Sequence, residues 1–222
     1  MKLSVTTIAL TATLASAYPQ LGGEPDALGF DISNHQPTVD YKAAYAGGLR
    51  FVFIKATEGT DYIDKVFPTH WAGARDAGFI TGAYHYAHGT TDPVVQAQVF
   101  VKNGGKWQRD GKTLPGVVDM EGVCTGFSTD WLTKFTNEYR TLTGRNAIIY
   151  TSPSWWKTCM NNTAVFGKTN PLWLARWADA PGAVPPGWKN YTIWQYNDTN
   201  PYQGDSDRFN GGMDQVKRLA WG

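Results

Sequence analysis

The sequence lacks several features by which enzymes and binding proteins are often recognised. Its 20 basic and 19 acidic residues leave a net charge of only +1. A nearly neutral chain offers no electrostatic reason to bind nucleic acid or an anionic membrane. The Gly-x-Ser-x-Gly and His-Glu-x-x-His motifs of many serine hydrolases and zinc peptidases are absent. His85 and His88 have no cysteine or carboxylate companion at zinc-site spacing, so we expect neither a metal nor a cofactor.

Long apolar segments are also scarce, and the one candidate lies at the N-terminus. Leu3–Leu14 is largely apolar, follows a basic start, and precedes Ala15-Ser16-Ala17, which has the small-x-small pattern of a cleavage site. The segment is too short to span a membrane, so we predict a signal peptide at residues 1–17. Residues 18–28 are polar and contain Gly and Pro, which predicts a pro-segment or a flexible arm. We expect residues 29–222 to form a single domain in a secreted, extracellular, monomeric product.

Cysteine is rare, but its number is informative. Cys124 and Cys159 form an even pair in a chain predicted to be exported, which favours a disulfide. In the chain-entropy model, closing a ring of this size stabilises the fold by roughly 3–4 kcal/mol.

The sequence does contain a regular alternation of strand-like and helical segments. Eight segments have the composition of strands, the last being the weakest: Gly29–Ser33, Phe51–Thr57, Ile80–Ala87, Gly116–Glu121, Asn146–Ser152, Leu172–Trp177, Thr192–Asn197 and Asp207–Phe209. Six segments have helical spacing or capping residues: Asp40–Ala46, Lys65–Ala77, Asp92–Asn103, Ser128–Thr143, Pro153–Cys159 and Met213–Ala220. This order predicts an α/β fold, an irregular (β/α) barrel with about five βα units followed by three further strands.

Acidic side chains collect where the strands are predicted to end. Asp119 and Glu121 close the fourth strand, and residues two apart on a strand share a face. Neighbouring carboxylates in different environments can divide into a proton donor and an anion. Asp31 and Asp207 lie on the first and last strands. Because active sites of such barrels lie at the strand ends, we interpret the four acids as a catalytic site. The alternative is that the fourth strand has ended and its acids are solvated.

Five motifs, in this order and spacing, resemble glycoside hydrolase family 25, the Ch-type lysozymes. They are Gly29-Phe30-Asp31-Ile32-Ser33, Phe53-Ile54-Lys55-Ala56-Thr57-Glu58-Gly59, Gly82-Ala83-Tyr84-His85-Tyr86, Val118-Asp119-Met120-Glu121 and Trp194-Gln195-Tyr196. The cysteine pair and Trp155-Trp156 resemble secreted members of fungal type. The resemblance implies an N-acetylmuramidase that hydrolyses the β-1,4 bond between N-acetylmuramic acid and N-acetylglucosamine in the glycan strands of peptidoglycan.

The resemblance also implies roles for individual residues. Glu121 matches the general acid, and Asp119 matches the carboxylate that works beside it. Asp31 matches an acid on the first strand and Asp207 an acid near the C-terminus, both in electrostatic support. Four aromatic residues at strand ends are expected to line the sugar cleft: Tyr84, Tyr150, Trp194 and Tyr196.

Two other functions remain open at this point. Another barrel glycosidase, such as a chitinase, would also use strand-end carboxylates, although the run Asp-x-x-Asp-x-Asp-x-Glu is absent. A catalytically dead barrel that binds carbohydrate is the second, and the intact set of acids argues against it. The spacing does not decide the stereochemistry either. The Cα atoms of Asp119 and Glu121, about 6.6 Å apart on a strand, permit the carboxyl separations of both retaining and inverting enzymes.

Overall fold

Runs rich in Val, Ile, Leu and Phe form the strands, as their composition favours. The computed structural model describes residues 25–222, so the predicted signal peptide and residues 18–24 of the predicted arm lie outside the described residues. The strands are β1 Leu28–Ile32, β2 Leu49–Glu58, β3 Tyr62–Ile63, β4 Ile80–Tyr86, β5 Val117–Asp119, β6 Ile148–Thr151, β7 Leu172–Ala175, β8 Ile193–Asn197 and β9 Asp205–Phe209. The helices are α1 Tyr41–Ala46, α2 Phe67–Asp76, α3 Pro93–Phe100, α4 Thr129–Thr143, α5 Pro153–Cys159 and α6 Met213–Trp221, with a π-helical turn at Val101–Gly105 and a 3-10 turn at Val165–Lys168.

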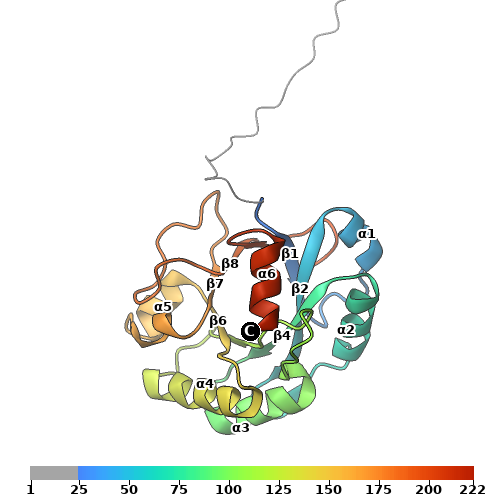
Figure 1. Ribbon diagram of the computed structural model, residues 1–222. Helices are drawn as coiled ribbons and strands as arrows, with labels where there is room; N and C mark the ends of the chain where they lie inside the picture. The colour runs from blue at the N-terminus through green and yellow to red at the C-terminus, as the bar shows by residue number, and fades with distance from the viewer. Residues whose placement is uncertain (1–24) are drawn as a thin grey trace, which may run out of the picture.

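Hydrogen bonds join the strands into a closed barrel (Figure 1). The order around it is β1-β9-β8-β7-β6-β5-β4-β2, and β2 pairs with β1 to close the ring. Barrel neighbours are parallel except at β9, which runs antiparallel to both β1 and β8. The short β3 pairs with the end of β2 and was not predicted, because two residues show no alternation. The predicted fold class is confirmed: five βα units precede β7, β8 and β9.

Along each strand, side chains point alternately into the barrel and toward the surrounding helices. The first set forms an inner core and the second set forms an outer core. Phe51, Phe53 and Trp173 belong to the inner core, where the rings of Phe53 and Trp173 have centroids 4.7 Å apart. The outer faces pack beneath α1–α5, which lie around the periphery in Figure 1. This division means that inward-facing residues near the open end of the barrel can form a site.

The last helix covers the opposite end of the barrel. In Figure 1, α6 lies across the middle of the ring of helices. Its buried residues Val216 and Ala220 belong to the inner core together with Ile80 and Ile148, the first residues of β4 and β6. The barrel is therefore filled from the N-terminal strand ends, and only the C-terminal strand ends remain for a pocket.

Capping residues explain where the longer helices begin and end. The Ser128 side chain accepts the N–H of Trp131 at the start of α4. Gly144 ends that helix with φ of 75°, a left-handed conformation that glycine adopts at low cost. Asp92 caps α3 through the N–H groups that follow Pro93, the first helical residue. These limits match the predicted ones closely because caps are local in sequence.

The residues immediately before β1 are packed against the barrel. Asp26 Oδ1 accepts the N–H of Gly211 at 3.1 Å, and the Ala27 carbonyl accepts the N–H of Phe209 at 2.8 Å. Residues 26–28, which the sequence assigned to an arm, thus pair with the C-terminal part of the chain. Between residues 25 and 222, the helices are all too short or too polar to cross a membrane.

The predicted disulfide is present. It joins Cys124, in the loop after β5, to Cys159, the last residue of α5, with Cα atoms 4.9 Å apart and a sequence separation of 35. The disulfide therefore joins the loop after β5 to the helix after β6. In the chain, α4 lies between the two cysteines.

Replacing both cysteines in a Cys124→Ser/Cys159→Ser variant is expected to lower the free energy of unfolding by about 3 kcal/mol. The unfolded variant regains the loop entropy that the cross-link removes. Urea denaturation monitored by fluorescence measures the change, and reduced wild type is the matched comparison. A variant within about 0.5 kcal/mol of oxidised wild type, the size of an ordinary surface substitution, would contradict a stabilising role.

Candidate active site

A pocket opens inside the barrel at the C-terminal ends of the parallel strands. Its volume is about 100 Å³, and we call it the inner pocket. Four carboxylic acids line it: Asp31, Asp119, Glu121 and Asp205. The other lining residues are Tyr84, Tyr150, Trp173 and Gln195. Three of the four acids that the sequence singled out therefore meet in one cavity.

Strand register brings these acids together. Asp31 on β1 pairs with Asp205 on β9, and Asp119 on β5 pairs with Tyr150 on β6. Strand β5 ends at Asp119, so Glu121 lies two residues beyond it, whereas the sequence predicted both on one strand. The intervening Met120 is buried in the outer core and donates its N–H to the Tyr150 carbonyl at 2.9 Å. The extended pairing continues through Met120, which keeps Asp119 and Glu121 on the pocket side.

Gln195 connects the polar side chains of the pocket. Its Oε1 accepts the hydroxyl of Tyr150 at 2.9 Å and the indole N–H of Trp177 at 3.0 Å. Its Nε2 donates to Asp31 Oδ2 at 2.9 Å and to Asp205 Oδ2 at 3.2 Å. All four hydrogen-bonding positions of the amide are used, so Gln195 fixes two acids and two aromatic rings relative to one another.

Burial raises the pKa of every acid in the pocket. For Asp31, burial and then the charge of Asp205 raise the pKa to about 7, and burial raises the pKa of Asp205 to about 6. Burial and then the charge of Glu121 raise the pKa of Asp119 well above its ordinary value. Burial also raises the pKa of Glu121. Since adjacent carboxyl groups do not ionise together at low cost, the pocket retains protons at weakly acidic pH.

Lys55 supplies the opposing positive charge. Its ammonium group acts to lower the pKa of both Asp119 and Glu121, against the effect of burial. The Nζ atom lies 2.6 Å from Glu58 Oε2 and 5.0 Å from the centroid of the Tyr86 ring. A salt bridge and a cation–π contact therefore hold the charge in position beside the acids.

Asp207 lies below the pocket and does not line it. Because β9 is antiparallel, its N-terminal residue Asp205 is at the open end, and Asp207 is deeper and 0% exposed. Asp207 Oδ1 accepts the indole N–H of Trp173 at 2.9 Å. Burial and then the charge of Asp31 raise the pKa of Asp207 well above its ordinary value. Asp207 thus lies near Asp31 but deeper inside the barrel.

The four predicted sugar-binding aromatics separate into two groups. Tyr84 and Tyr150 line the inner pocket. Trp194 and Tyr196 flank the inward-facing Gln195 on β8, so they face the outer core, where the Trp194 indole donates to the Arg176 carbonyl at 2.7 Å. The structure therefore does not bring Trp194 and Tyr196 to the inner pocket.

Sequence reasoning missed three pocket residues and one residue at the rim. Asp205 was overlooked because its strand was expected to start later, and Trp173 and Gln195 because strand patterns do not say which face is inward. Trp177 is the fourth: its side chain is 60% exposed, two residues after β7, and its indole N–H binds Gln195. An exposed indole at a pocket edge is a suitable stacking platform for a sugar ring.

A second hollow adjoins the first. It has a volume of about 180 Å³, and we call it the outer pocket. Its walls include Tyr86, His88, Val123, Thr125 and Phe127, together with Glu121. Of the residues that line the two pockets, Glu121 is the one they share, so this residue lies at their junction.

A barrel with paired carboxyl groups of raised pKa and aromatic rings at its strand ends has the site of a glycoside hydrolase. The sequence model of Glycosyl hydrolases family 25 matches residues 30–205. The chain belongs to this family and is a lysozyme-type hydrolase.

Individual relatives are similar over most of their length. The chain is 48% identical to the N,O-diacetylmuramidase of Arthroderma benhamiae over all of both chains. It is 46% identical to that of Chalaropsis sp, over 87% of this chain and 99% of the relative. The solved muramidase from Trichobolus zukalii is 50% identical with a TM-score of 0.86, over 88% of this chain and 99% of that one.

Asp207→Asn is expected to raise the free energy of unfolding at pH 7–8 and to change it less at pH 4. Burial raises the pKa of Asp207 above its ordinary 3.8. The native state therefore keeps a proton that the unfolded chain releases above about pH 4, and stability falls as pH rises. Asparagine stays neutral and can accept the indole N–H of Trp173, so the gain in stability should grow from pH 4 to pH 8.

Urea denaturation at pH 4, 6 and 8 measures this effect. Asp179→Asn, in an exposed loop, is the matched control and should leave the pH dependence unchanged. If the stability of Asp207→Asn fell with pH as steeply as that of wild type, Asp207 would not carry the proton.

Proposed function

We propose that this protein is a secreted lysozyme that hydrolyses the β-1,4 bond between N-acetylmuramic acid and N-acetylglucosamine in peptidoglycan. The relatives named N,O-diacetylmuramidase support a muramic acid substrate. The nearly neutral charge gives no electrostatic reason to expect nucleic acid or an anionic membrane as the partner. Secretion remains a prediction from the N-terminal sequence, residues 1–17.

The observation that carries this proposal is the position of Glu121 between two adjoining pockets. A general acid must reach the oxygen that joins two sugars, so one sugar lies on each side of it. The inner pocket, with Asp31, Asp119 and Tyr150, would hold the sugar whose bond is cleaved at C1. The outer pocket would hold the leaving sugar. The raised pKa of Glu121 keeps the proton available at weakly acidic pH.

Asp119 offers a specific contact for the muramic sugar. Its side chain is only 6% exposed, and among residues 25–222 its Oδ1 has no hydrogen-bond donor. A buried acceptor without a donor is costly unless a ligand supplies one. The 2-acetamido group of the substrate carries a suitable N–H. We therefore infer that Asp119 orients the acetamide so that its carbonyl oxygen attacks C1 of the same sugar.

The proposed reaction has two steps. In the first, Glu121 gives its proton to the glycosidic oxygen, the C1–O bond breaks, and the acetamide oxygen bonds to C1. Asp119 stabilises the positive charge that develops on the acetamide nitrogen. In the second step, the Glu121 carboxylate takes a proton from a water molecule, and the water oxygen attacks C1. The bond between C1 and the acetamide oxygen then breaks, which opens the ring that this bond had closed. Two inversions at C1 give net retention, and Glu121 regains its proton.

Glu121→Gln is expected to lower kcat on peptidoglycan by about 10²–10⁴-fold, because the amide cannot deliver a proton. Gln is nearly isosteric, so the melting temperature should be close to that of wild type. Clearing of a cell-wall suspension measures activity, and mass analysis of the new reducing ends identifies the bond. A variant that kept more than about a tenth of the wild-type rate would rule out Glu121 as the general acid.

Product stereochemistry tests the mechanism separately. NMR at early times should show the β-anomer, and an initial α-product would exclude any retaining route. The alternative retaining route has Asp119 as the nucleophile that attacks C1. A sugar ester trapped on Asp119 would establish that route and exclude the acetamide mechanism.

Two further functions are separated by substrate choice. A chitinase would cleave chitin oligomers faster than bacterial walls, and the proposed lysozyme should do the reverse. A carbohydrate-binding barrel without activity would bind walls without clearing them. Comparing the two substrates at equal enzyme concentration, with Glu121→Gln as the inactive control, decides among these outcomes.

A further inference from the structure

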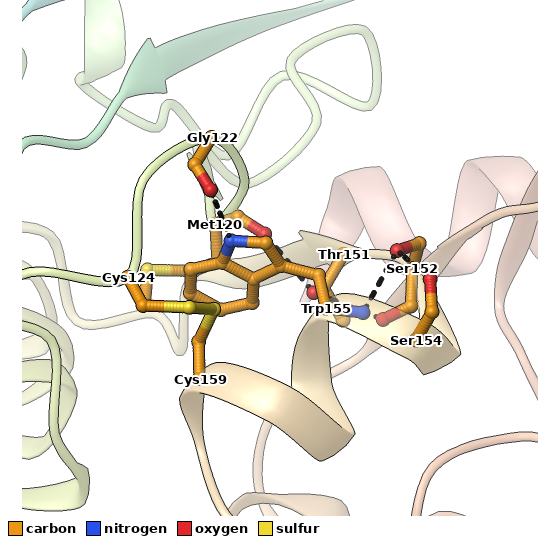
Figure 2. Close-up of a disulfide and its surroundings, with 8 residues drawn as sticks. All are labelled: Met120, Gly122, Cys124, Thr151, Ser152, Ser154, Trp155 and Cys159. Atoms are coloured by element: carbon orange, nitrogen blue, oxygen red, sulfur yellow. Dashed lines mark hydrogen bonds between the residues drawn. A yellow bond between two sulfur atoms is a disulfide. The ribbon is translucent and has the colours of Figure 1, made fainter.

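Glu121 lies in the loop just beyond β5, and hydrogen bonds hold the peptide groups on both sides of it. The Thr151 hydroxyl donates to the carbonyl of Met120 at 3.0 Å. The Trp155 indole N–H donates to the carbonyl of Gly122 at 2.9 Å. Figure 2 shows these two donors, which come from the end of β6 and the start of α5. The same short segment therefore holds the backbone before and after the acid.

A disulfide joins the loop to this segment at a third point. Cys124, two residues after Gly122, is bonded to Cys159 at the end of α5 (Figure 2). Gly122 has φ of 71°, which other residues rarely adopt, and a Cβ on it would lie 2.6 Å from the Tyr86 hydroxyl. The loop thus turns sharply at Gly122 and has little space to shift toward β4.

The two donors are themselves well fixed. Thr151 is 0% exposed and is the last residue of β6. Trp155 is half-buried, its backbone N–H donates to Ser152 Oγ at 3.2 Å, and its ring packs edge-on to Phe127 at 5.3 Å between centroids. Phe127 lines the outer pocket, so the segment that holds Glu121 also supports the wall beside it.

We propose that Thr151 and Trp155 are positioning residues for Glu121, which hold its backbone so that the carboxyl group stays at the junction of the two pockets. This inference rests on the proposed role of Glu121 as the general acid. Neither residue is among those that line the inner or the outer pocket. Their effect on the reaction passes through the peptide groups of Met120 and Gly122.

Loss of either donor should have two consequences. The carboxyl group would spend less time in line with the glycosidic oxygen, and small displacements of a catalytic group lower rates strongly. The Glu121 carboxyl group would also be exposed to water more often. Since burial is the main cause of the raised pKa of Glu121, that pKa should fall toward its ordinary value.

Other titratable groups also face Glu121, and the test leaves them unchanged. They lie on β1, β2, β4, β5, β6 and β9 and in the loop after β4, and they are Asp31, Lys55, Tyr84, Tyr86, His88, Asp119, Tyr150 and Asp205. A shift in the pH profile after substitution of Thr151 or Trp155 would therefore report a change in how Glu121 is held.

Two variants each remove one donor, and Thr151→Val also keeps the shape of the side chain. Thr151→Val replaces the hydroxyl by a methyl group, and Trp155→Phe keeps a ring against Phe127. Each is expected to lower kcat on soluble peptidoglycan fragments about three- to tenfold, the effect of losing one hydrogen bond, with KM changed less than about twofold. The basic limb of the pH profile of kcat/KM should move to lower pH, because it reports the acid in the free enzyme.

Matched controls separate positioning from stability. Thr151→Ser keeps the hydroxyl and should restore most of the kcat lost in Thr151→Val. Trp156→Phe removes the neighbouring indole N–H, which donates to the Thr163 carbonyl at 3.0 Å, away from Glu121. Trp156→Phe should lower the melting temperature and leave the basic limb in place.

The outcomes for the proposed function and for this inference differ. A wild-type protein that cleaves no peptidoglycan would overturn the proposed function and this inference with it. An active wild type, with Thr151→Val and Trp155→Phe that both keep its kcat and its pH profile, would overturn the inference alone. Circular dichroism and melting curves establish which variants are folded, and if only one of them folds, its kcat and pH profile decide.

Discussion

The removal of carboxyl groups from water is the constraint on which this structure depends. Asp31, Asp119 and Asp207 are buried inside the barrel, where an unpaired ionised carboxylate costs several kcal/mol. Two arrangements reduce that cost. Gln195 donates a hydrogen bond to Asp31. Lys55 offsets part of the rest from β2. Burial of these acids lowers the stability of the fold and raises their pKa values. The same raised pKa values allow the site to deliver a proton.

The reversed direction of β9 explains how two acids on one strand acquire different roles. Asp205 and Asp207 share a face, but the antiparallel strand presents its N-terminal end at the mouth of the barrel. Asp205 lines the pocket and is partly solvated, whereas Asp207 is enclosed between Trp173 and Asp31. A parallel strand would have reversed this order and left Asp205 in the interior.

Much of the fold could be predicted from the sequence because its signals are local. The caps at Asp92 and Ser128 and the stop at Gly144 mark helices wherever the rest of the chain lies. The carboxylate cluster followed from strand ends meeting at one edge. The direction of each strand and the face on which each side chain lies could not be predicted in this way. Period-two alternation is the same for parallel and antiparallel strands, and it does not say whether Gln195 or its aromatic neighbours face inward. Those choices depend on contacts between distant parts of the chain.

Closure of the barrel through β9 also has a consequence for biosynthesis. The strand pairs with β1, so the first and last segments of the barrel must meet before the hydrogen-bond ring is complete. The N-terminal part of the chain leaves the ribosome first, so the edges of β1 and β8 stay unpaired until β9 has also been released. Such edges are templates for intermolecular pairing. The chain therefore keeps two strand edges open to intermolecular pairing until β9 inserts between β1 and β8.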